Sequence, residues 1–202
     1  MSSKQKPLLL VISAPSGAGK SSLCNRLVEK FPQMVYSISC TTRPPRGNEQ
    51  DGVHYHFLSE EEFSKRIARG EFLEHALVHG NRYGTLKQTV YDALAQGRDI
   101  IMDIDVQGAK QIRLACAALA DDDAIKQSLV DIFIAPPSME ELRRRLCGRS
   151  TDSAEVIEKR MRNAADEMKH RPYYQHTVIN DIFERAVDEL AEIIAREHHN
   201  RW

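Results

Sequence analysis

The sequence contains no apolar run close to the roughly 20 residues that a membrane-spanning helix needs. It also lacks an excess of charge, because 28 Lys and Arg residues against 29 Asp and Glu residues leave a formal net charge of −1. We therefore expect no membrane partner and no nucleic-acid partner, and only a local basic site stays open. Repeats and low-complexity tracts are missing as well. The 42% hydrophobic and 28% charged residues are typical of one globular domain.

Cysteine is scarce, and its spacing argues against disulfide and metal frameworks. The four cysteines are Cys24, Cys40, Cys116 and Cys147. They form no CxxC pair and have no histidines at metal-binding spacing, so we interpret them as reduced thiols of a cytoplasmic protein. The lysines before the apolar run Leu8–Ala14 could be misread as a short signal peptide. That run is at the lower length limit and leads into a phosphate-binding loop that needs it, so we expect it to be retained.

Four apolar segments have the character of buried parallel strands. They are Leu8–Ser13, Ile100–Ile104, Leu129–Ala135 and a shorter one around Thr177–Ile179. Apolar residues at helical spacing predict helices between and after them. One carries Leu23, Leu27, Val28 and Phe31, others span Leu86–Ala95, Gln107–Leu119 and Ser138–Leu146, and the last carries Phe183, Val187, Leu190 and Ile194. Strands alternating with helices predict an α/β fold with a parallel sheet and right-handed crossovers.

Two stretches interrupt this alternation. Residues 37–84 are richer in Gly, Pro, Tyr and His and contain strand-like pieces such as Val53–Leu58, so we interpret them as an inserted subdomain. Residues 143–171 carry seven arginines and are interpreted as a helical flap. Capping-box spacing, which predicts helix starts, occurs at Ser59 with Glu62 and at Ser138 with Glu141.

A glycine-rich loop joins the first strand to the first helix. It matches the phosphate-loop pattern G-x-x-x-x-G-K-[ST] except that Ala14 takes the first glycine position. Gly17 and Gly19 allow successive backbone N–H groups to turn toward a phosphate, and the N-terminus of the following helix also favours an anion. We expect Lys20 to reach the β- and γ-phosphates of a nucleoside triphosphate and the Ser21 hydroxyl to ligate Mg²⁺. The residues expected to hold the triphosphate are Ala14, Pro15, Ser16, Gly17, Ala18, Gly19, Lys20, Ser21 and Ser22.

Five further strings identify the second substrate. They are Ser39–Arg46, Gly52–Tyr55, Glu71–His75, Gly80–Thr85 and Asp103–Gly108. Together with the phosphate loop, these strings and their order resemble the guanylate kinase family over nearly the whole chain. The resemblance implies a phosphate-loop NTPase core at 1–36, 86–136 and 172–202, a GMP-binding subdomain at about 37–85 and an Arg-rich helical lid at about 137–171. It also implies transfer of the γ-phosphoryl of Mg·ATP to GMP, giving ADP and GDP, with Mg²⁺ as cofactor. We expect dGMP to be accepted as well, because no residue is identifiable as a required reader of the 2′-OH.

The chemistry of the inserted subdomain suits GMP. The residues expected to bind it are Ser39, Arg43, Arg46, Tyr55, Glu74, Tyr83, Thr85, Asp103 and Asp105. Arg43 and Arg46 suit one dianionic phosphate, to which the two tyrosines add hydroxyl donors. Glu74 is an acceptor-only group that matches the N1–H and N2–H₂ donors of guanine, while Ser39 and Thr85 suit the O6 side. Asp105 resembles the second acidic contact to the base in the family.

Catalysis of this transfer needs alignment and positive charge rather than a strong base, because the accepting phosphate oxygen is already anionic. The residues expected to be catalytic are Lys20, Arg43, Asp103, Arg149 and Arg160. At the end of a buried strand, Asp103 resembles a Walker B acid that acts on the metal through water or orients an arginine. The resemblance implies that Arg149 also covers the adenine of ATP and that Asn180 approaches the adenine ring.

Two other functions fit parts of this pattern. A related phosphate-loop kinase with another acceptor would keep the loop, but Glu74 and Ser39 favour guanine. A protein-binding module without catalysis would be expected to lose loop groups, whereas Gly19, Lys20 and Ser21 are intact. The chain departs from the family at Cys40, Arg82 and Ser150, and the last departure leaves the shape of the lid loop open. Whether the protein is a monomer or a homo-oligomer is open too.

Overall fold

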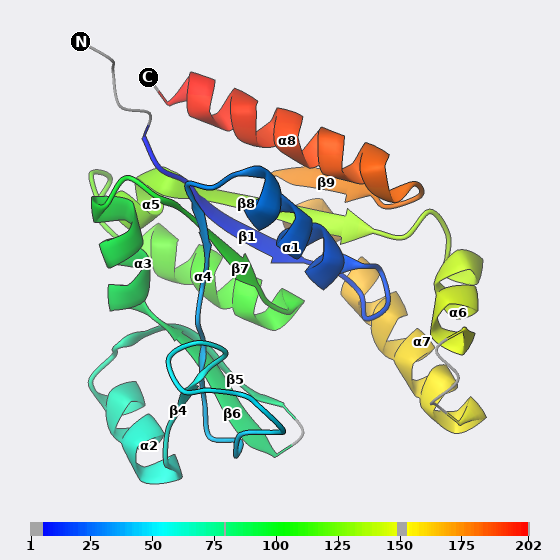
Figure 1. Cartoon of the computed structure of the whole chain (residues 1–202), viewed down its shortest axis with the longest axis horizontal. Helices are drawn as coiled ribbons and strands as arrows, with labels where there is room; N and C mark the ends of the chain where they lie inside the picture. The colour runs from blue at the N-terminus through cyan, green and yellow to red at the C-terminus, as the bar shows by residue number, and fades with distance from the viewer. Residues whose placement is uncertain (1–5, 79, 149–152, 202) are drawn as a thin grey trace.

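A computed structural model describes residues 6–78, 80–148 and 153–201 of the chain. Within them, a parallel sheet of five strands has the order β2-β7-β1-β8-β9 (Figure 1). In chain order these strands are β1 (Leu9–Ser13), β2 (Met34–Tyr36), β7 (Asp99–Asp103), β8 (Leu129–Ala135) and β9 (His176–Ile179). Every residue of β1 and β8 is buried, as expected for strands covered on both faces.

Helices cover both faces of this sheet. They are α1 (Lys20–Lys30) and α8 (Phe183–Asn200) on one face, and α3 (Lys87–Ala95), α4 (Val106–Ala118) and α5 (Ala124–Ser128) on the other (Figure 1). Alternate residues of β1 divide between these layers, because successive strand side chains point to opposite faces. Leu10 and Ile12 pack with α1 and α8, whereas Leu9 and Val11 pack with α3 and α4.

The register of the central strands positions the site. Ile12 in β1 lies beside Asp103 in β7, so the carboxyl ends of these two neighbouring strands meet at one edge of the sheet. The glycine-rich loop leaves β1 at this edge and returns as α1. The carboxyl edge of an open α/β sheet is where such folds bind ligands.

The inserted residues form a second, mixed sheet with the order β4-β3-β6-β5. Its elements are β3 (Cys40–Thr41), β4 (His56–Phe57), β5 (Phe72–Val78) and β6 (Asn81–Leu86), with α2 (Glu60–Ala68) packed against it. Phe63 of α2 stacks on Phe72 at a ring distance of 4.4 Å and closes a small core with Cys40. The strand expected over Val53–Leu58 was too long, because only His56–Phe57 is extended.

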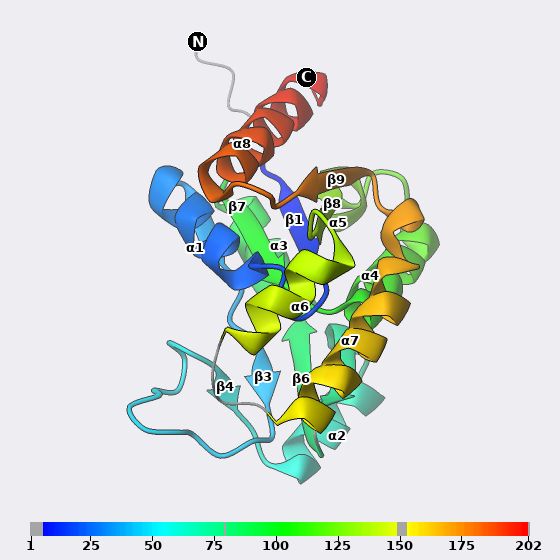
Figure 2. The same cartoon turned by 90° about the vertical axis from the view of Figure 1, so that its right-hand side faces the viewer.

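The arginine-rich stretch contains two helices, α6 (Met139–Cys147) and α7 (Ala154–Met168), which lie side by side (Figure 2). They share a small core of Leu142, Leu146 and Ala164. A 3₁₀ turn (Arg171–Tyr173) then leads back to β9.

The fold class predicted from the sequence is confirmed, and most predicted elements agree with observed ones to within a few residues. At both predicted capping boxes the serine hydroxyl accepts the backbone N–H three residues on. The carboxylates of Glu62 and Glu141 instead bind nearby arginines. Phe183, placed on the buried stripe of the last helix, is 36% exposed because it begins that helix at the surface. None of the helices in the described part of the chain has the length and apolar character to span a bilayer.

A buried histidine fastens the C-terminal helix to the start of the sheet. Asp99 accepts the Leu8 N–H at 2.8 Å and lies 3.0 Å from His198 Nε2, while His198 Nδ1 lies 3.0 Å from the carbonyl of Lys6. A carboxylate and a carbonyl only accept, so both ring nitrogens must donate and the ring must be protonated. The hydrogen bond to Asp99 accordingly raises the pKa of His198.

We expect the His198→Ala substitution to be more destabilising at pH 6 than at pH 9, by about 1–2 kcal/mol. The folded-state pKa lies above the unfolded value of about 6.5. The stabilisation from the charged ring is therefore complete below that value and is lost as the pH rises through the folded-state pKa. Urea unfolding at both pH values measures this difference. His199→Ala, one residue further along and exposed, is the matched control, and an equal loss at both pH values in His198→Ala would contradict the charged state.

Candidate active site

The phosphate loop has the backbone that its sequence predicts. Gly17 and Gly19 have φ angles of 94° and 89°, which L residues with a Cβ rarely adopt. Side chains also leave no room at these positions. A Cβ on Gly19 would lie 2.5 Å from Asn180 Nδ2, and one on Gly17 would lie 2.8 Å from Leu146 Cδ2. Gly19 begins α1 without a side-chain cap, so the helix N-terminus is left for an anion.

Asp103 gathers the reactive groups of the loop. Lys20 Nζ lies 2.7 Å from Asp103 Oδ1 and 2.6 Å from the carbonyl of Ile104. The Ser21 hydroxyl donates to Asp103 Oδ2 over 2.7 Å, and the Tyr36 hydroxyl donates to the same oxygen over 2.9 Å. The structure thus joins three predicted residues, Lys20, Ser21 and Asp103, and adds Tyr36, which lies outside all of the sequence motifs.

A cavity of about 390 Å³ opens above the loop. Its lining residues are Ala14, Pro15, Ser16, Gly17, Gly19, Lys20, Ser21, Ser22, Asp103, Asp105 and Glu167. Glu167 comes from α7 and was not predicted. Its Oε2 lies 3.4 Å from the Ser16 N–H, and burial raises the pKa of its carboxyl. No motif marks this residue, because only the return of the lid helix brings it to the loop.

Asn180 supports the loop from behind. Its buried side-chain amide donates to the backbone carbonyl of Ala18 over 2.7 Å. The backbone carbonyl of Asn180 accepts a hydrogen bond from Arg145 Nη2 over 2.9 Å. The side chain expected near the adenine ring is therefore already bound to the loop backbone.

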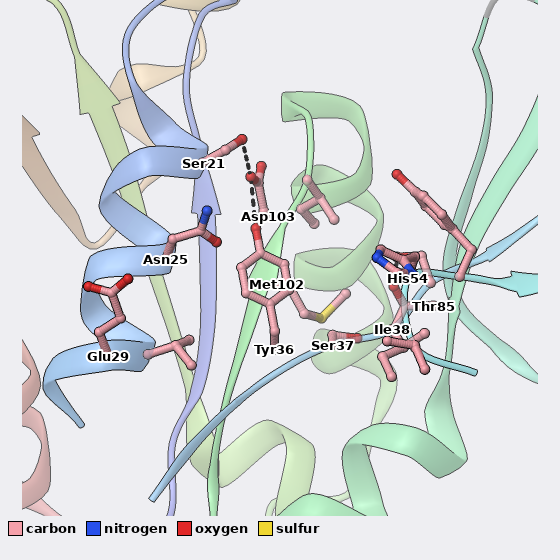
Figure 3. A pocket seen from close by; sticks show the side chains of 15 residues that line it. Ser21, Asn25, Glu29, Tyr36, Ser37, Ile38, His54, Thr85, Met102 and Asp103 are labelled. Atoms are coloured by element: carbon pink, nitrogen blue, oxygen red, sulfur yellow. Dashed lines mark hydrogen bonds between the residues drawn. The ribbon is translucent and has the colours of Figure 1, made fainter. Parts of the chain in front are cut away.

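A larger cavity of about 830 Å³ lies between α1 and the small sheet (Figure 3). Its lining includes five of the predicted site residues, namely Ser21, Ser39, Tyr55, Thr85 and Asp103. Ser21 and Asp103 also line the cavity above the phosphate loop, so the two cavities meet at these side chains. An adjoining hollow of about 260 Å³ adds Glu74, Tyr83 and Asp105 to Ser39, Tyr55 and Asp103.

Glu74 is a buried carboxyl group. It is 6% exposed on β5 and hydrogen-bonds to Thr85, whose hydroxyl lies 3.5 Å from that of Ser39. Burial, with a smaller contribution from the charge of Asp105, raises the pKa of Glu74 to about 7 although Thr85 opposes the rise. Gly108 leaves the space that the carboxyl occupies, because a Cβ there would lie 3.1 Å from Glu74 Oε2.

Asp105 has a structural task that the sequence did not reveal. Its Oδ1 accepts the Gly108 N–H over 2.8 Å and caps the N-terminus of α4. The same helix is tied to β5 by two hydrogen bonds between Gln111 and the backbone of His75. The Gln111 contacts join the small sheet to the core.

Arg43 and Arg46, the two arginines predicted to bind a phosphate, have an acidic partner that the sequence analysis missed. The buried Arg43 forms a two-pronged ion pair with Glu49, with both distances 2.9 Å, and Glu49 also accepts the Arg46 N–H over 2.8 Å. The guanidinium lies 5.3 Å from the ring centre of Tyr55, and Tyr55 contacts Tyr83 edge to face. The signal for Glu49 was its position three residues after Arg46 in the same Pro-stiffened loop.

The arginines predicted to belong to a lid lie partly within the described residues. Arg149 and the neighbouring Ser150 lie outside the described residues, and Arg160 lies half-buried on α7. Arg143 pairs with Glu158 and joins α6 to α7, and Arg144 pairs with Glu141 on the exposed face of α6.

Comparison with known proteins points to one family. The family model described as guanylate kinase matches residues 5–197. A curated guanylate kinase of Syntrophotalea carbinolica is 50% identical over 194 residues, covering 96% of this chain and 88% of that protein. One from Geobacter metallireducens is 45% identical and covers 96% and 91%. The crystal structure of guanylate kinase from Anaplasma phagocytophilum matches with a TM-score of 0.72 at 33% identity, covering 96% of this chain and 88% of that one.

We expect the Glu74→Gln substitution to stabilise the fold at pH 8 and to have little effect at pH 5. A pKa of about 7 against an ordinary 4.5 means that folding opposes ionisation. Stability is therefore full below about pH 4.5 and falls as the pH rises toward 7, by about 3 kcal/mol at 1.36 kcal/mol per pH unit. Urea unfolding at both pH values measures this. Glu189→Gln, at an exposed position on α8, is the control, and equal stability of wild type and Glu74→Gln at pH 8 would show that Glu74 is not desolvated.

Proposed function

Because the chain belongs to the guanylate kinase family and has guanylate kinase activity, we propose that its two adjoining cavities hold the two nucleotides of that reaction. ATP lies against the phosphate loop, and GMP lies between α1 and the small sheet. The observation that carries this assignment is the meeting of both cavities at Ser21 and Asp103. A γ-phosphoryl group leaving one nucleotide would there face the phosphate of the other.

The loop suits the triphosphate. Its two positive-φ glycines, the uncapped start of α1 and the Lys20 ammonium all favour an anion at one point. Lys20 now shares its charge with Asp103, and it would turn to the β- and γ-phosphates when they arrive. We assign Ala14 to Ser22 to this site, with Asn180 holding the loop and Arg149 and Arg160 of the lid facing the transferred group.

Mg²⁺ fits beside the loop. The donors are the Ser21 hydroxyl and the Asp103 carboxylate, which are hard oxygen ligands that already lie 2.7 Å apart. Such a small protein contribution is usual for Mg²⁺, which keeps waters and takes its other ligands from phosphates. Ser21 would hold the ion directly and Asp103 through water. The ion would supply charge neutralisation at the phosphates.

Glu74 is proposed to select guanine. As a carboxylate it accepts the N1–H and N2–H₂ donors of guanine, with Asp105 as a second acceptor and Ser39 and Thr85 at the O6 side. With a pKa near 7, Glu74 is only partly ionised at neutral pH, and two bound donors would stabilise its ionised form. Adenine has neither donor and would leave a buried carboxyl unpaired, which is the condition for strong rejection.

The GMP phosphate is assigned to Arg43, Arg46, Tyr55 and Tyr83. Glu49 takes one N–H from each terminal nitrogen of Arg43, and the carbonyl of Pro44 takes another from Nη1. The Nε–H and the second Nη2–H have neither of these partners, and the guanidinium also interacts with Tyr83. Glu49 thereby fixes the guanidinium at the cost of some positive potential.

The chemistry then needs no general base. The bond between the γ-phosphorus and the bridging oxygen of ATP breaks, and a bond to an anionic oxygen of GMP forms, giving ADP and GDP. Lys20, Arg43, Arg149 and Arg160 would stabilise the charge on the transferring group, and Asp103 would orient Lys20 and Ser21. We further propose that 37–85 and 137–171 act as the GMP-binding subdomain and the lid, that dGMP is also accepted and that the protein is cytoplasmic.

We expect rapid ADP release from Mg·ATP with GMP or dGMP, and none above background with AMP, CMP or UMP.

In Glu74→Gln, kcat/KM for GMP should fall by about 10²-fold or more, because the amide replaces one of the two acceptor oxygens with a donor NH₂ group. The wild-type value should rise with pH through about 7 as Glu74 ionises, and this rise should be smaller in the variant. Glu71→Gln, on the same segment and paired with Arg69, is the control. Undiminished preference of Glu74→Gln for GMP over AMP would overturn the assignment of the base site.

Glu49→Ala should raise KM for GMP about tenfold and leave KM for ATP unchanged, because Arg43 loses the partner that orients it. Glu49→Gln, which keeps one acceptor oxygen, should give an intermediate KM. Steady-state kinetics with each substrate varied in turn measures both. A lower KM for GMP in Glu49→Ala would mean that Glu49 competes with the substrate phosphate instead of positioning Arg43.

A further inference from the structure

Tyr36 is placed by the sheet at the junction of the two cavities. It ends β2, where it pairs with Ile101 of β7, and the Ser37 N–H donates to the Ile101 carbonyl over 2.9 Å. Asp103 lies two residues beyond Ile101, so its side chain is on the same face of the sheet. That face packs against α1, the helix that carries Lys20 and Ser21. Three elements therefore converge on one carboxylate.

The three donors to Asp103 are not equivalent. Lys20 binds Oδ1. Ser21 and Tyr36 share Oδ2 (Figure 3). Lys20 and Ser21 belong to the phosphate loop, and the proposed function turns both toward nucleotide and metal. Tyr36 belongs to a strand and lines the larger cavity from the opposite side. It is the donor whose position does not depend on the occupancy of the loop.

The hydroxyl of Tyr36 has a defined direction. A carboxylate accepts only, so Tyr36 is the donor to Asp103. The buried thiol of Cys24 on α1 interacts with the same hydroxyl, and burial raises the pKa of this thiol, so it stays protonated. The bond from Tyr36 to Asp103 Oδ2 is the contact that restrains the carboxylate from the β2 side.

We propose that Tyr36 is a positioning residue for phosphoryl transfer, whose hydroxyl keeps Asp103 aligned with Lys20 and Ser21 while the loop binds its substrate. This rests on the proposed role of Asp103. Without the hydroxyl, the Asp103 carboxylate keeps only Lys20 and Ser21 as donors, and both are also proposed to bind nucleotide or metal. Rotation of the carboxylate about χ2 would then be less restricted. The aromatic ring is not needed for this role, so Tyr36→Phe removes the bond and retains the wall of the cavity.

The test is a double-mutant cycle of Tyr36→Phe and Asp103→Asn, with kcat and both KM values measured. Tyr36→Phe should lower kcat about tenfold, equivalent to about 1.4 kcal/mol, and leave both KM values within about twofold. In the Asp103→Asn background it should lower kcat by less than about twofold, because its partner has already changed. The ¹³C shift of the Asp103 carboxyl in nucleotide-free protein should move in Tyr36→Phe.

Tyr91→Phe is the matched control, because it removes a similar Tyr–Asp bond of 2.8 Å to Asp123, between α3 and the start of α5. It should leave kcat and the Asp103 shift unchanged, and thermal unfolding of all variants separates lost stability from lost catalysis. If Asp103→Asn is slow but Tyr36→Phe has wild-type kcat, or if the two effects multiply in full, the role of Tyr36 is refuted while that of Asp103 stands. An Asp103→Asn enzyme with wild-type kcat would refute both.

Discussion

One carboxylate at the end of one strand organises the whole site. Asp103 lies next to the end of β1 because β7 and β1 are parallel neighbours in register, and that neighbourhood brings it to the start of α1. Lys20 and Ser21 then meet it through ion-pair and hydrogen-bond contacts of 2.7 Å. Such a cluster needs a rigid support, since a displacement of about 1 Å in the reacting geometry is costly. The fully buried strand β1 beside Asp103 provides that support.

Charge on the acceptor side is balanced within the small sheet. Arg43 is buried and would be costly without a partner, and Glu49 supplies one with matching two-pronged geometry. Glu74 is the opposite case, because its burial opposes ionisation and only Thr85 offsets it. The charge of Arg43 is thus neutralised by Glu49, whereas the ionised form of Glu74 is destabilised by burial until hydrogen-bond donors bind it. Both arrangements agree with the proposed ligand, which has a dianionic phosphate at one end and N–H donors at the other.

The two sheets are joined by both polar and apolar contacts. Gln111 binds the backbone of His75, and Leu73 of β5 packs in the core with residues of α3 and α4. The chain also crosses between the sheets where it enters and leaves the insert. The small sheet is therefore anchored to the core mainly through β5 and α4.

Local patterns in the sequence determined the strand, loop and helix around the phosphate site, since apolar runs, glycines and a Lys-Ser pair are readable without knowing what lies beside them. They also predicted the residues of the acceptor site, through motifs whose order resembles one family. The short strands β2 and β3 were not readable, because their residues are extended by pairing with distant neighbours rather than by their own propensity. The same reason hid Tyr36 and Glu167, which reach the site only because β2 lies beside β7 and α7 returns to the loop. Which residues bear chemistry is a matter of side-chain type, but which of them share a proton, a charge or a cavity is decided by distances that only tertiary packing sets.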